Sequence, residues 1–252
     1  MGLFDFMKKK CIRLICFDLD NTLYDYSSAE AEAEVHIAGI IKEKFSKDKL
    51  DQEVILRIFN EIKHHHMHHD LEPEKFSRSL WIREVIEHLG LKMTGKILDN
   101  YSKTLERKYW DFLTPKIQLF PDTLYTLNSL KISSRYKIAC ITDSDGAKEI
   151  KIDRIRALGL DKYFDFIITT DDTKKNKPSV ENWEYLLKMS GQKVQECMMV
   201  GDHPEVDLLN AKKLGFVTVW SKEHIPTTIH IKYVDYEITG IGQLIGLLKR
   251  YN

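Results

Sequence analysis

Acidic residues gather at several places where a short apolar run of the sequence ends. The runs end in Asp18-Leu19-Asp20-Asn21-Thr22, in Thr142-Asp143-Ser144 and in Gly201-Asp202, with Asp207 five residues beyond Asp202. Carboxylates crowded at one edge repel one another and raise each other's pKa unless a cation neutralises them. A hard divalent ion with oxygen ligands, best matched by Mg²⁺, is the economical solution. Lys177, in Asn176-Lys177-Pro178, offers a second positive charge.

The elements that would bring these residues together are short, continuous apolar runs, which are typical of strands buried on both faces of a parallel sheet. They lie at residues 13–17, 137–141, 166–169, 197–200 and 217–220. Helix-like segments separate the later runs, at residues 122–133, 146–158, 179–189 and 205–214, and the last three end at Gly159, Gly191 and Gly215, where a C-terminal cap is expected. This alternation predicts an α/β fold with an open parallel sheet, in which ligands bind beyond the carboxyl ends of the strands.

Residues 26–114 break the alternation, because they contain no convincing strand and four amphipathic helix patterns, near 30–46, 51–68, 74–89 and 95–112. We therefore predict two units: an α/β core formed by residues 1–24 and 115–252, and an inserted all-helical cap formed by residues 25–114. Tyr24, Asp25 and Tyr26 stand at the junction. A hinge and ordinary linker packing are about equally compatible with these three residues.

In their order along the chain, these motifs resemble those of the haloacid dehalogenase (HAD) superfamily, and of its small-molecule phosphatases in particular. The likeness rests on Asp18-Leu19-Asp20-Asn21-Thr22-Leu23, then Thr142, then Lys177-Pro178, then Gly201-Asp202 with Asp207. The helical insertion lies between the first and second motifs, where that family places its C1-type cap. Asp-rich strand ends are also common turn chemistry, but turns would have to coincide at four strand ends. The resemblance implies a Rossmann-like parallel core with a helical cap, and a phosphoric monoester hydrolase.

The resemblance also implies catalytic roles for four residues. Asp18 would be the nucleophile that becomes an aspartyl phosphate. Asp20 would protonate the leaving alkoxide and then accept a proton from the attacking water. Thr142 would donate a hydrogen bond to the transferring phosphoryl group, and Lys177 would offset charge between nucleophile and phosphate.

Metal and substrate contacts follow from the same likeness. Mg²⁺ would be held by the Asp18 side chain, the Asp20 backbone carbonyl and Asp202, with Asp207 as a nearby partner. Thr142, Asp143 and Lys177 would contact the substrate. Asp143 stands where many relatives have asparagine, so its role stays open, and His203, next to Asp202, is either a site residue or a bystander.

The predicted activity is the Mg²⁺-dependent hydrolysis of a small phosphorylated metabolite. Two alternatives stay open: phosphoryl transfer to another acceptor, as in a phosphomutase, and a catalytically silent relative that binds a metal or a protein. The chain offers one more candidate metal site in His64-His65-His66-Met67-His68-His69-Asp70, where i,i+4 pairs on a helix could hold a transition metal. We favour a solvated helix end there, because no cysteine or further acidic ligand set accompanies the histidines.

Composition excludes several other classes of protein. The 252 residues carry 38 basic and 38 acidic side chains, so no broad cationic field attracts nucleic acid or an anionic membrane. The four cysteines show no C-x-x-C spacing, which argues against structural zinc or a disulfide framework. With neither a signal peptide nor a membrane span predicted, we expect a cytoplasmic protein, and the sequence leaves its oligomeric state open.

Overall fold

The computed structural model describes residues 11–46 and 49–251, so residues 1–10, 47–48 and 252, which the predicted domain ranges include, lie outside the description. A six-stranded sheet forms the core, in the order β5-β4-β1-β6-β7-β8, and every neighbouring pair is parallel. Its strands are β1 (Leu14–Phe17), β4 (Lys137–Thr142), β5 (Phe166–Thr169), β6 (Cys197–Gly201), β7 (Val217–Ser221) and β8 (Tyr236–Ile238). The predicted α/β class and all five predicted strands are confirmed. The sixth strand, β8, has three residues and lies at the edge of the sheet, so it carries no apolar run that the sequence could display.

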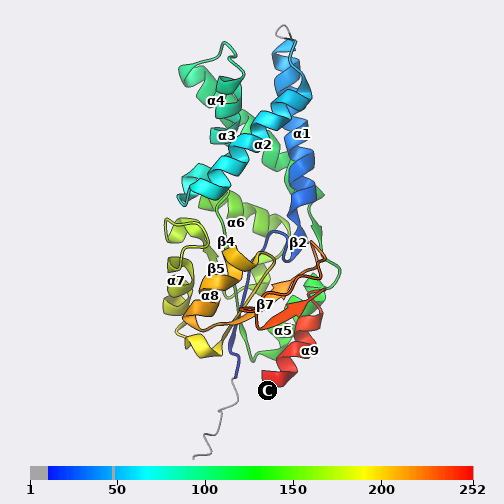
Figure 1. The fold of residues 1–252 in the computed structure, drawn as a ribbon, viewed down its shortest axis with the longest axis vertical. Coiled ribbons are helices and arrows are strands. Elements are labelled where there is room, and N and C mark those ends of the chain that lie inside the picture. The colour runs from blue at the N-terminus through cyan, green and yellow to red at the C-terminus, as the bar shows by residue number, and fades with distance from the viewer. Residues whose placement is uncertain (1–10, 47–48, 252) are drawn as a thin grey trace, which may run out of the picture.

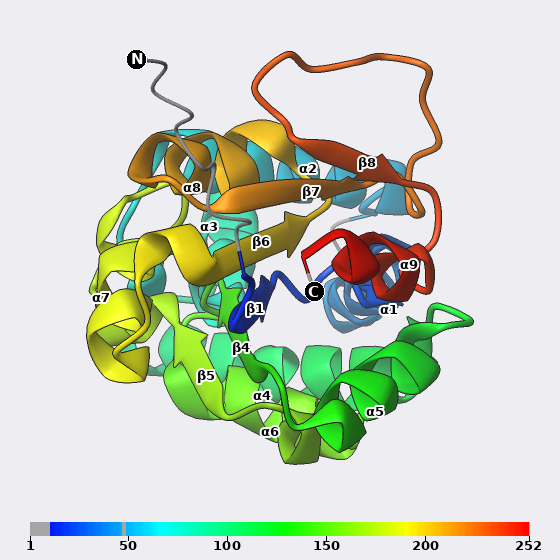
Figure 2. The ribbon, with the colours of Figure 1, turned by 90° about the horizontal axis from the view of Figure 1, so that it is seen from below.

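Helices cover both faces of this sheet because successive strand residues point to opposite sides. In β1, Ile15 and Phe17 belong to one apolar cluster, with the buried residues of α5 (Thr123–Ser133) and α9 (Gln243–Leu248). Leu14 and Cys16 belong to the other, with α7 (Glu181–Ser190) and α8 (Leu209–Leu214). Figure 2 shows these two helix pairs on opposite sides of the sheet. The continuous apolar strand runs are thus explained by burial on both faces.

Four long helices form a separate layer above the sheet (Figure 1). They are α1 (Tyr26–Lys44), α2 (Gln52–His69), α3 (Arg78–His88) and α4 (Gly95–Leu113). The helix expected at 74–89 is divided into the short 3₁₀ helix η2 (Pro73–Phe76) and α3, with Ser77 between them. The Ser77 hydroxyl accepts a hydrogen bond from the Leu80 N–H and so caps α3. None of the described helices is long and apolar enough to cross a membrane.

The chain passes between core and helices twice, and the two passages lie side by side. They form the antiparallel pair β2 (Tyr24–Asp25) and β3 (Gln118–Leu119). Asp25 also caps α1, because its carboxylate accepts a hydrogen bond of 3.0 Å from the Ser28 N–H. Residues 24–26, for which the sequence left a hinge and ordinary linker packing open, therefore lie at a paired, capped junction.

The helical layer also touches the core at a second place, beyond this junction. A methyl group on Gly146, in the loop after β4, would lie 2.7 Å from Cβ and 2.9 Å from the backbone nitrogen of Ser77. Leu71, six residues before Ser77, makes a further contact: its carbonyl accepts a hydrogen bond of 2.6 Å from the N–H of Asn176, in the loop after β5. The segment between α2 and α3 is therefore seated on the loops that follow β4 and β5.

Gly146→Ala tests this contact, with Gly159→Ala as the matched control. Both glycines have positive φ values, +96° and +66°, but nothing lies within 4 Å of a methyl group on Gly159. The control should lose about 1–2 kcal/mol of unfolding free energy from backbone strain alone, whereas Gly146→Ala should lose more, because its φ lies outside the left-handed α region and its methyl group also meets Ser77. Urea unfolding of both variants measures the difference. Equal losses would mean that Ser77 does not pack against Gly146 in solution.

Candidate active site

A buried ammonium group lies between two carboxylates at the carboxyl end of the sheet. Nζ of Lys177 is 2.6 Å from Oδ1 of Asp18 and 2.7 Å from Oδ1 of Asp207. Asp18 follows β1, Lys177 follows β5, and Asp207 lies in a π-helical turn after β6 (Pro204–Leu208). All three side chains are buried, so the two carboxylates are stabilised by the ammonium group between them and not by water. The sheet thus brings three predicted site residues into contact.

Asp202 completes an acidic cluster with Asp18 and Asp207. One carboxylate oxygen from each lies within 4.8 Å of the others. Thr22 links two of them, since its hydroxyl is 2.9 Å from Oδ2 of Asp18 and 3.3 Å from Oδ1 of Asp202. Burial raises the pKa of both Asp18 and Asp202, and the neighbouring carboxylates raise it further, although Lys177 opposes them. A cluster of oxygen donors with excess negative charge fits a hard divalent cation.

The turn after β6 explains why glycine precedes Asp202. A Cβ on Gly201 would lie 2.5 Å from Cβ of Asp207, so only glycine leaves room for that carboxylate. Oδ2 of Asp207 accepts a hydrogen bond of 3.0 Å from the His203 N–H, which fixes the side chain in the turn. His203 lines the cavity described below, while its Nδ1 accepts a weak hydrogen bond from the Val206 N–H. The glycine and the five-residue spacing are therefore a packing requirement of the cluster.

The Asp20 side chain lies apart from this cluster, among positive charges. Its carboxylate is 2.8 Å from Nζ of Lys151 and 2.6 Å from Nη1 of Arg154, and it accepts a 2.6 Å hydrogen bond from the Tyr24 hydroxyl. Asp145 shares both cations, at 3.1 Å from Lys151 and 2.8 Å from Arg154. Burial raises the pKa of Asp20, but the charges and hydrogen bonds of Arg154 and Lys151 outweigh it, and the pKa lies below its ordinary value.

Sequence reasoning missed these partners of Asp20. Lys151 and Arg154 lie three residues apart on α6 (Lys148–Ala157), so they share one face of the helix. Both are buried, at 1% and 2% exposure. The spacing is visible in the sequence, but an exposed basic stripe would look the same, and nothing in the sequence tells which face of α6 is covered.

Thr142 is the last residue of β4, and Asp143 follows it. The Thr142 hydroxyl is buried and has no hydrogen-bond partner in the part of the chain that the structure describes. Oδ1 of Asp143 accepts a hydrogen bond of 2.8 Å from the backbone N–H of Lys177. Asp143 therefore holds the loop that carries Lys177, a contact that the sequence did not indicate.

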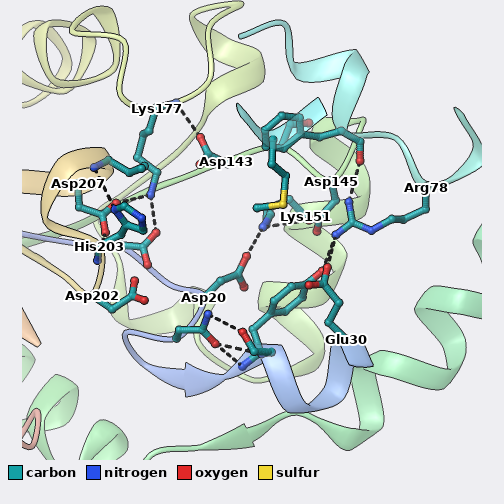
Figure 3. Close-up of a pocket in the computed structure, with 18 of the residues that line it drawn as sticks. Asp20, Glu30, Arg78, Asp143, Asp145, Lys151, Lys177, Asp202, His203 and Asp207 are labelled. Carbon is teal, nitrogen blue, oxygen red and sulfur yellow. Dashed lines mark hydrogen bonds and ion pairs between the residues drawn. The ribbon is translucent and has the colours of Figure 1, made fainter. Parts of the chain in front are cut away.

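A cavity of about 240 Å³ lies between this edge of the sheet and the helical layer (Figure 3). Its floor includes Asp18, Asp20, Asp143, Lys177, Asp202 and Asp207. Its opposite wall is made by the helical layer, with Tyr26, Glu30, Met67, Phe76, Arg78 and Trp81. A ligand in the cavity would therefore touch both the sheet edge and the helical layer.

The histidine run divides into one buried and four exposed residues. His64, His65, His68 and His69 are exposed, with ring centroids 4.1 Å apart for His64 and His68 and 5.1 Å apart for His65 and His69. His66 is buried, and its two ring nitrogens lie 2.6 Å from Asp70 and 3.0 Å from Glu84. Most of the run therefore faces solvent at the end of α2, while His66 packs into the helical layer.

Comparison with known proteins agrees with the site geometry. The family model of the haloacid dehalogenase-like hydrolases matches residues 12–215. The chain belongs to this family. The matched region contains every acidic residue of the cluster, as well as Lys177 and Thr142.

Individual relatives of this HAD hydrolase cover nearly its whole length. A glyceraldehyde 3-phosphate phosphatase from Methanocaldococcus jannaschii is 28% identical over 245 residues, which cover 94% of this chain and 97% of the relative. A ribulose-1,5-bisphosphate 5-phosphatase from Halopiger xanaduensis is 25% identical over 248 residues, which cover 93% of this chain and 98% of the relative. Among solved structures, a 2-haloacid dehalogenase from Pseudomonas syringae has a TM-score of 0.75 at 23% identity, covering 96% of this chain and 100% of its own. That last likeness concerns the fold alone.

Asp143→Ala and Asp143→Asn separate a positioning role from a charge role in this HAD hydrolase. Alanine leaves the buried Lys177 N–H without an acceptor, which should cost about 1–3 kcal/mol of unfolding free energy. Asparagine keeps an oxygen acceptor at the same place, so its stability should stay close to that of the unmodified protein. Chemical denaturation measures both. Equal losses in the two variants would mean that the charge of Asp143 matters and its hydrogen bond does not.

Proposed function

We propose that this protein is a Mg²⁺-dependent phosphatase of a small phosphorylated metabolite, acting through an aspartyl phosphate on Asp18. The observation that carries the proposal is the position of Asp18, which lies on the cavity floor, bonded to Lys177 and next to two further carboxylates. A carboxylate nucleophile, a fixed cation and a metal-binding acidic cluster are the groups that phosphoryl transfer to the enzyme requires.

Formation of the intermediate uses the groups around Asp18. A carboxylate oxygen of Asp18 forms a bond to phosphorus while the bond from phosphorus to the ester oxygen breaks. Lys177 offsets the negative charge between nucleophile and phosphoryl group, and the unpartnered Thr142 hydroxyl is a donor for a phosphoryl oxygen. The leaving alkoxide takes a proton from Asp20.

The metal would be held by side-chain oxygens of Asp18 and Asp202 and by the backbone carbonyl of Asp20, with Asp207 nearby. When bound, Mg²⁺ supplies positive charge that offsets the charge of the transferring phosphoryl group. Asp207 also forms an ion pair with Lys177 and so helps to hold the Lys177 ammonium group in place. We assign Asp143 to the same positioning task, through the Lys177 N–H.

Asp20 would act as the acid in formation of the intermediate and as the base in its hydrolysis, and its surroundings favour the basic, ionised form. Lys151 and Arg154 keep the carboxylate ionised, which is the form that accepts a proton from the water attacking phosphorus in the second step. For the first step, Asp20 must loosen these ion pairs and carry a proton to the leaving oxygen. During one turnover, Asp20 thus alternates between an ionised state paired with Lys151 and Arg154 and a protonated state directed at the leaving oxygen.

Relatives support a phosphorylated substrate. The names of the two curated relatives given above describe phosphatases of phosphorylated three-carbon and five-carbon compounds. Lys177 and a metal held by the acidic cluster would bind the phosphate, and the cavity of about 240 Å³ suits a compact organic part, since pockets for drug-sized ligands have volumes of roughly 300–1,000 Å³.

Phosphate release from a panel of phosphorylated metabolites tests the proposed function. We expect release that EDTA stops and Mg²⁺ restores, because the carboxylates of the cluster repel one another without a cation. Asp18→Asn should abolish release and leave the fold intact, because an amide nearly preserves the shape but cannot attack phosphorus. A correctly folded Asp18→Asn variant with more than a trace of activity, or full activity in EDTA, would contradict the proposal.

The acid role of Asp20 predicts a dependence on the leaving group. An alkyl phosphate releases a strongly basic alkoxide that needs a proton, whereas a nitrophenyl phosphate releases a stable anion that hardly does. Asp20→Asn should therefore slow formation of the intermediate far more with the alkyl ester, and it should give an initial burst of nitrophenolate as phosphorylated enzyme accumulates. Rapid-mixing kinetics measure both. Equal slowing of the first step with both esters would make Asp20 a structural or metal residue only.

A further inference from the structure

Three cations line the cavity, and each is already paired with carboxylates. Lys177 contacts Asp18 and Asp207, while Lys151 lies 2.8 Å from Asp20 and 3.1 Å from Asp145. In total, seven carboxylates line the cavity against these three cations. Even with a divalent ion bound and no substrate present, the lining side chains carry more negative than positive charge. Little positive charge therefore remains for a second anionic group of the substrate.

Arg78 is the cation on the wall opposite the floor, and it is occupied as well. Its Nη2 donates to Oε1 of Glu30 at 2.9 Å and to the Tyr26 hydroxyl at 2.7 Å, and its Nη1 donates to the Phe76 carbonyl at 2.9 Å. Figure 3 shows the Arg78 and Glu30 side chains turned toward each other. Of the guanidinium nitrogens, Nε has no hydrogen-bond partner among residues 11–46 and 49–251. Because both Nη2 hydrogens are donated to Glu30 and Tyr26, the donors left on Arg78 do not form the parallel pair through which arginine usually binds a carboxylate, so they suit single hydrogen bonds to a hydroxyl or carbonyl oxygen.

The rest of that wall is mainly apolar. Met67, Phe76 and Trp81 line it, and the Arg78 guanidinium lies 4.1 Å from the centre of the Trp81 ring. A carboxylate or a second phosphate placed against these side chains would lose water without gaining a partner, which is costly for a charged group. An aldehyde, a ketone or a hydroxyl loses far less.

We propose that the cavity selects phosphomonoesters whose organic part is small and uncharged, and that it disfavours phosphorylated carboxylates. This inference rests on the proposed phosphatase function and specifies its substrate class. Glu30 is the residue that sets the preference, because it neutralises Arg78, which among the described lining residues is the cation on that wall that could bind a distal anion. Its role concerns specificity, not catalysis.

Two substrates that differ at one group test the inference on the unmodified enzyme. Glyceraldehyde 3-phosphate and 3-phosphoglycerate have the same three-carbon skeleton and differ in an aldehyde against a carboxylate. With Mg²⁺ present, kcat/KM should be higher for the aldehyde by about tenfold or more, because the carboxylate meets like charges. Equal values, or a preference for 3-phosphoglycerate, would overturn the inference and leave the phosphatase function standing. Absence of release from every phosphoester in the panel would overturn both.

Glu30→Gln tests whether Glu30 sets the preference by neutralising Arg78, and Glu34→Gln is the matched control. Both residues lie on α1 and contact Lys63, at 3.3 Å and 2.6 Å, but of the two only Glu30 lines the cavity and pairs with Arg78. Glu30→Gln should raise the ratio of kcat/KM for 3-phosphoglycerate to that for glyceraldehyde 3-phosphate by about tenfold, and Glu34→Gln should leave the ratio unchanged. The ratio is insensitive to partial loss of folded enzyme. An unchanged ratio in Glu30→Gln, or the same shift in both variants, would overturn the role of Glu30.

Discussion

Negative charge buried at the carboxyl end of a parallel sheet is the constraint on which this site depends. Asp18, Asp202 and Asp207 converge because β1 and β6 are neighbours in the sheet. Lys177 offsets part of that charge by contacting two of the three carboxylates. Several local features follow from the need to hold this arrangement: glycine at 201, the π-helical turn that carries Asp207, and the Asp143 contact to the backbone of Lys177.

A second charged cluster connects the nucleophile loop to the helical layer. Arg154 bonds Asp20, and its guanidinium also lies 4.7 Å from the Tyr26 ring and 5.6 Å from the Trp110 ring, which belong to α1 and α4. The setting of the proposed acid and base is therefore coupled to where the helices sit over the cavity. Ser77 packs against Gly146 at another contact between the helical layer and the core.

The sequence predicted what depends on local pattern. Continuous apolar runs located five of the six described strands of the core sheet, and the residues that follow two of them, Asp18 and Asp202, meet at one edge because the strands are parallel. Lys177, in the loop after β5, contacts Asp18 there. What it did not predict depends on burial between distant segments. In the sequence, Lys151 looks like any lysine on a helix, and its burial becomes evident only once α6 is packed in the fold. The helix expected at 74–89 is interrupted at Ser77, whose hydroxyl caps α3.

A covalent bond between Asp18 and phosphorus distinguishes the proposed chemistry most directly from attack by water. The enzyme can be mixed with a hydrolysed phosphoester and Mg²⁺, quenched in acid within milliseconds and reduced with borohydride, which converts an aspartyl phosphate into homoserine. Mass spectrometry of the peptide containing residue 18 should then find homoserine at Asp18 only when substrate was present. An unmodified Asp18 in enzyme quenched while turning over, under conditions that trap a synthetic acyl phosphate, would contradict covalent catalysis at this residue.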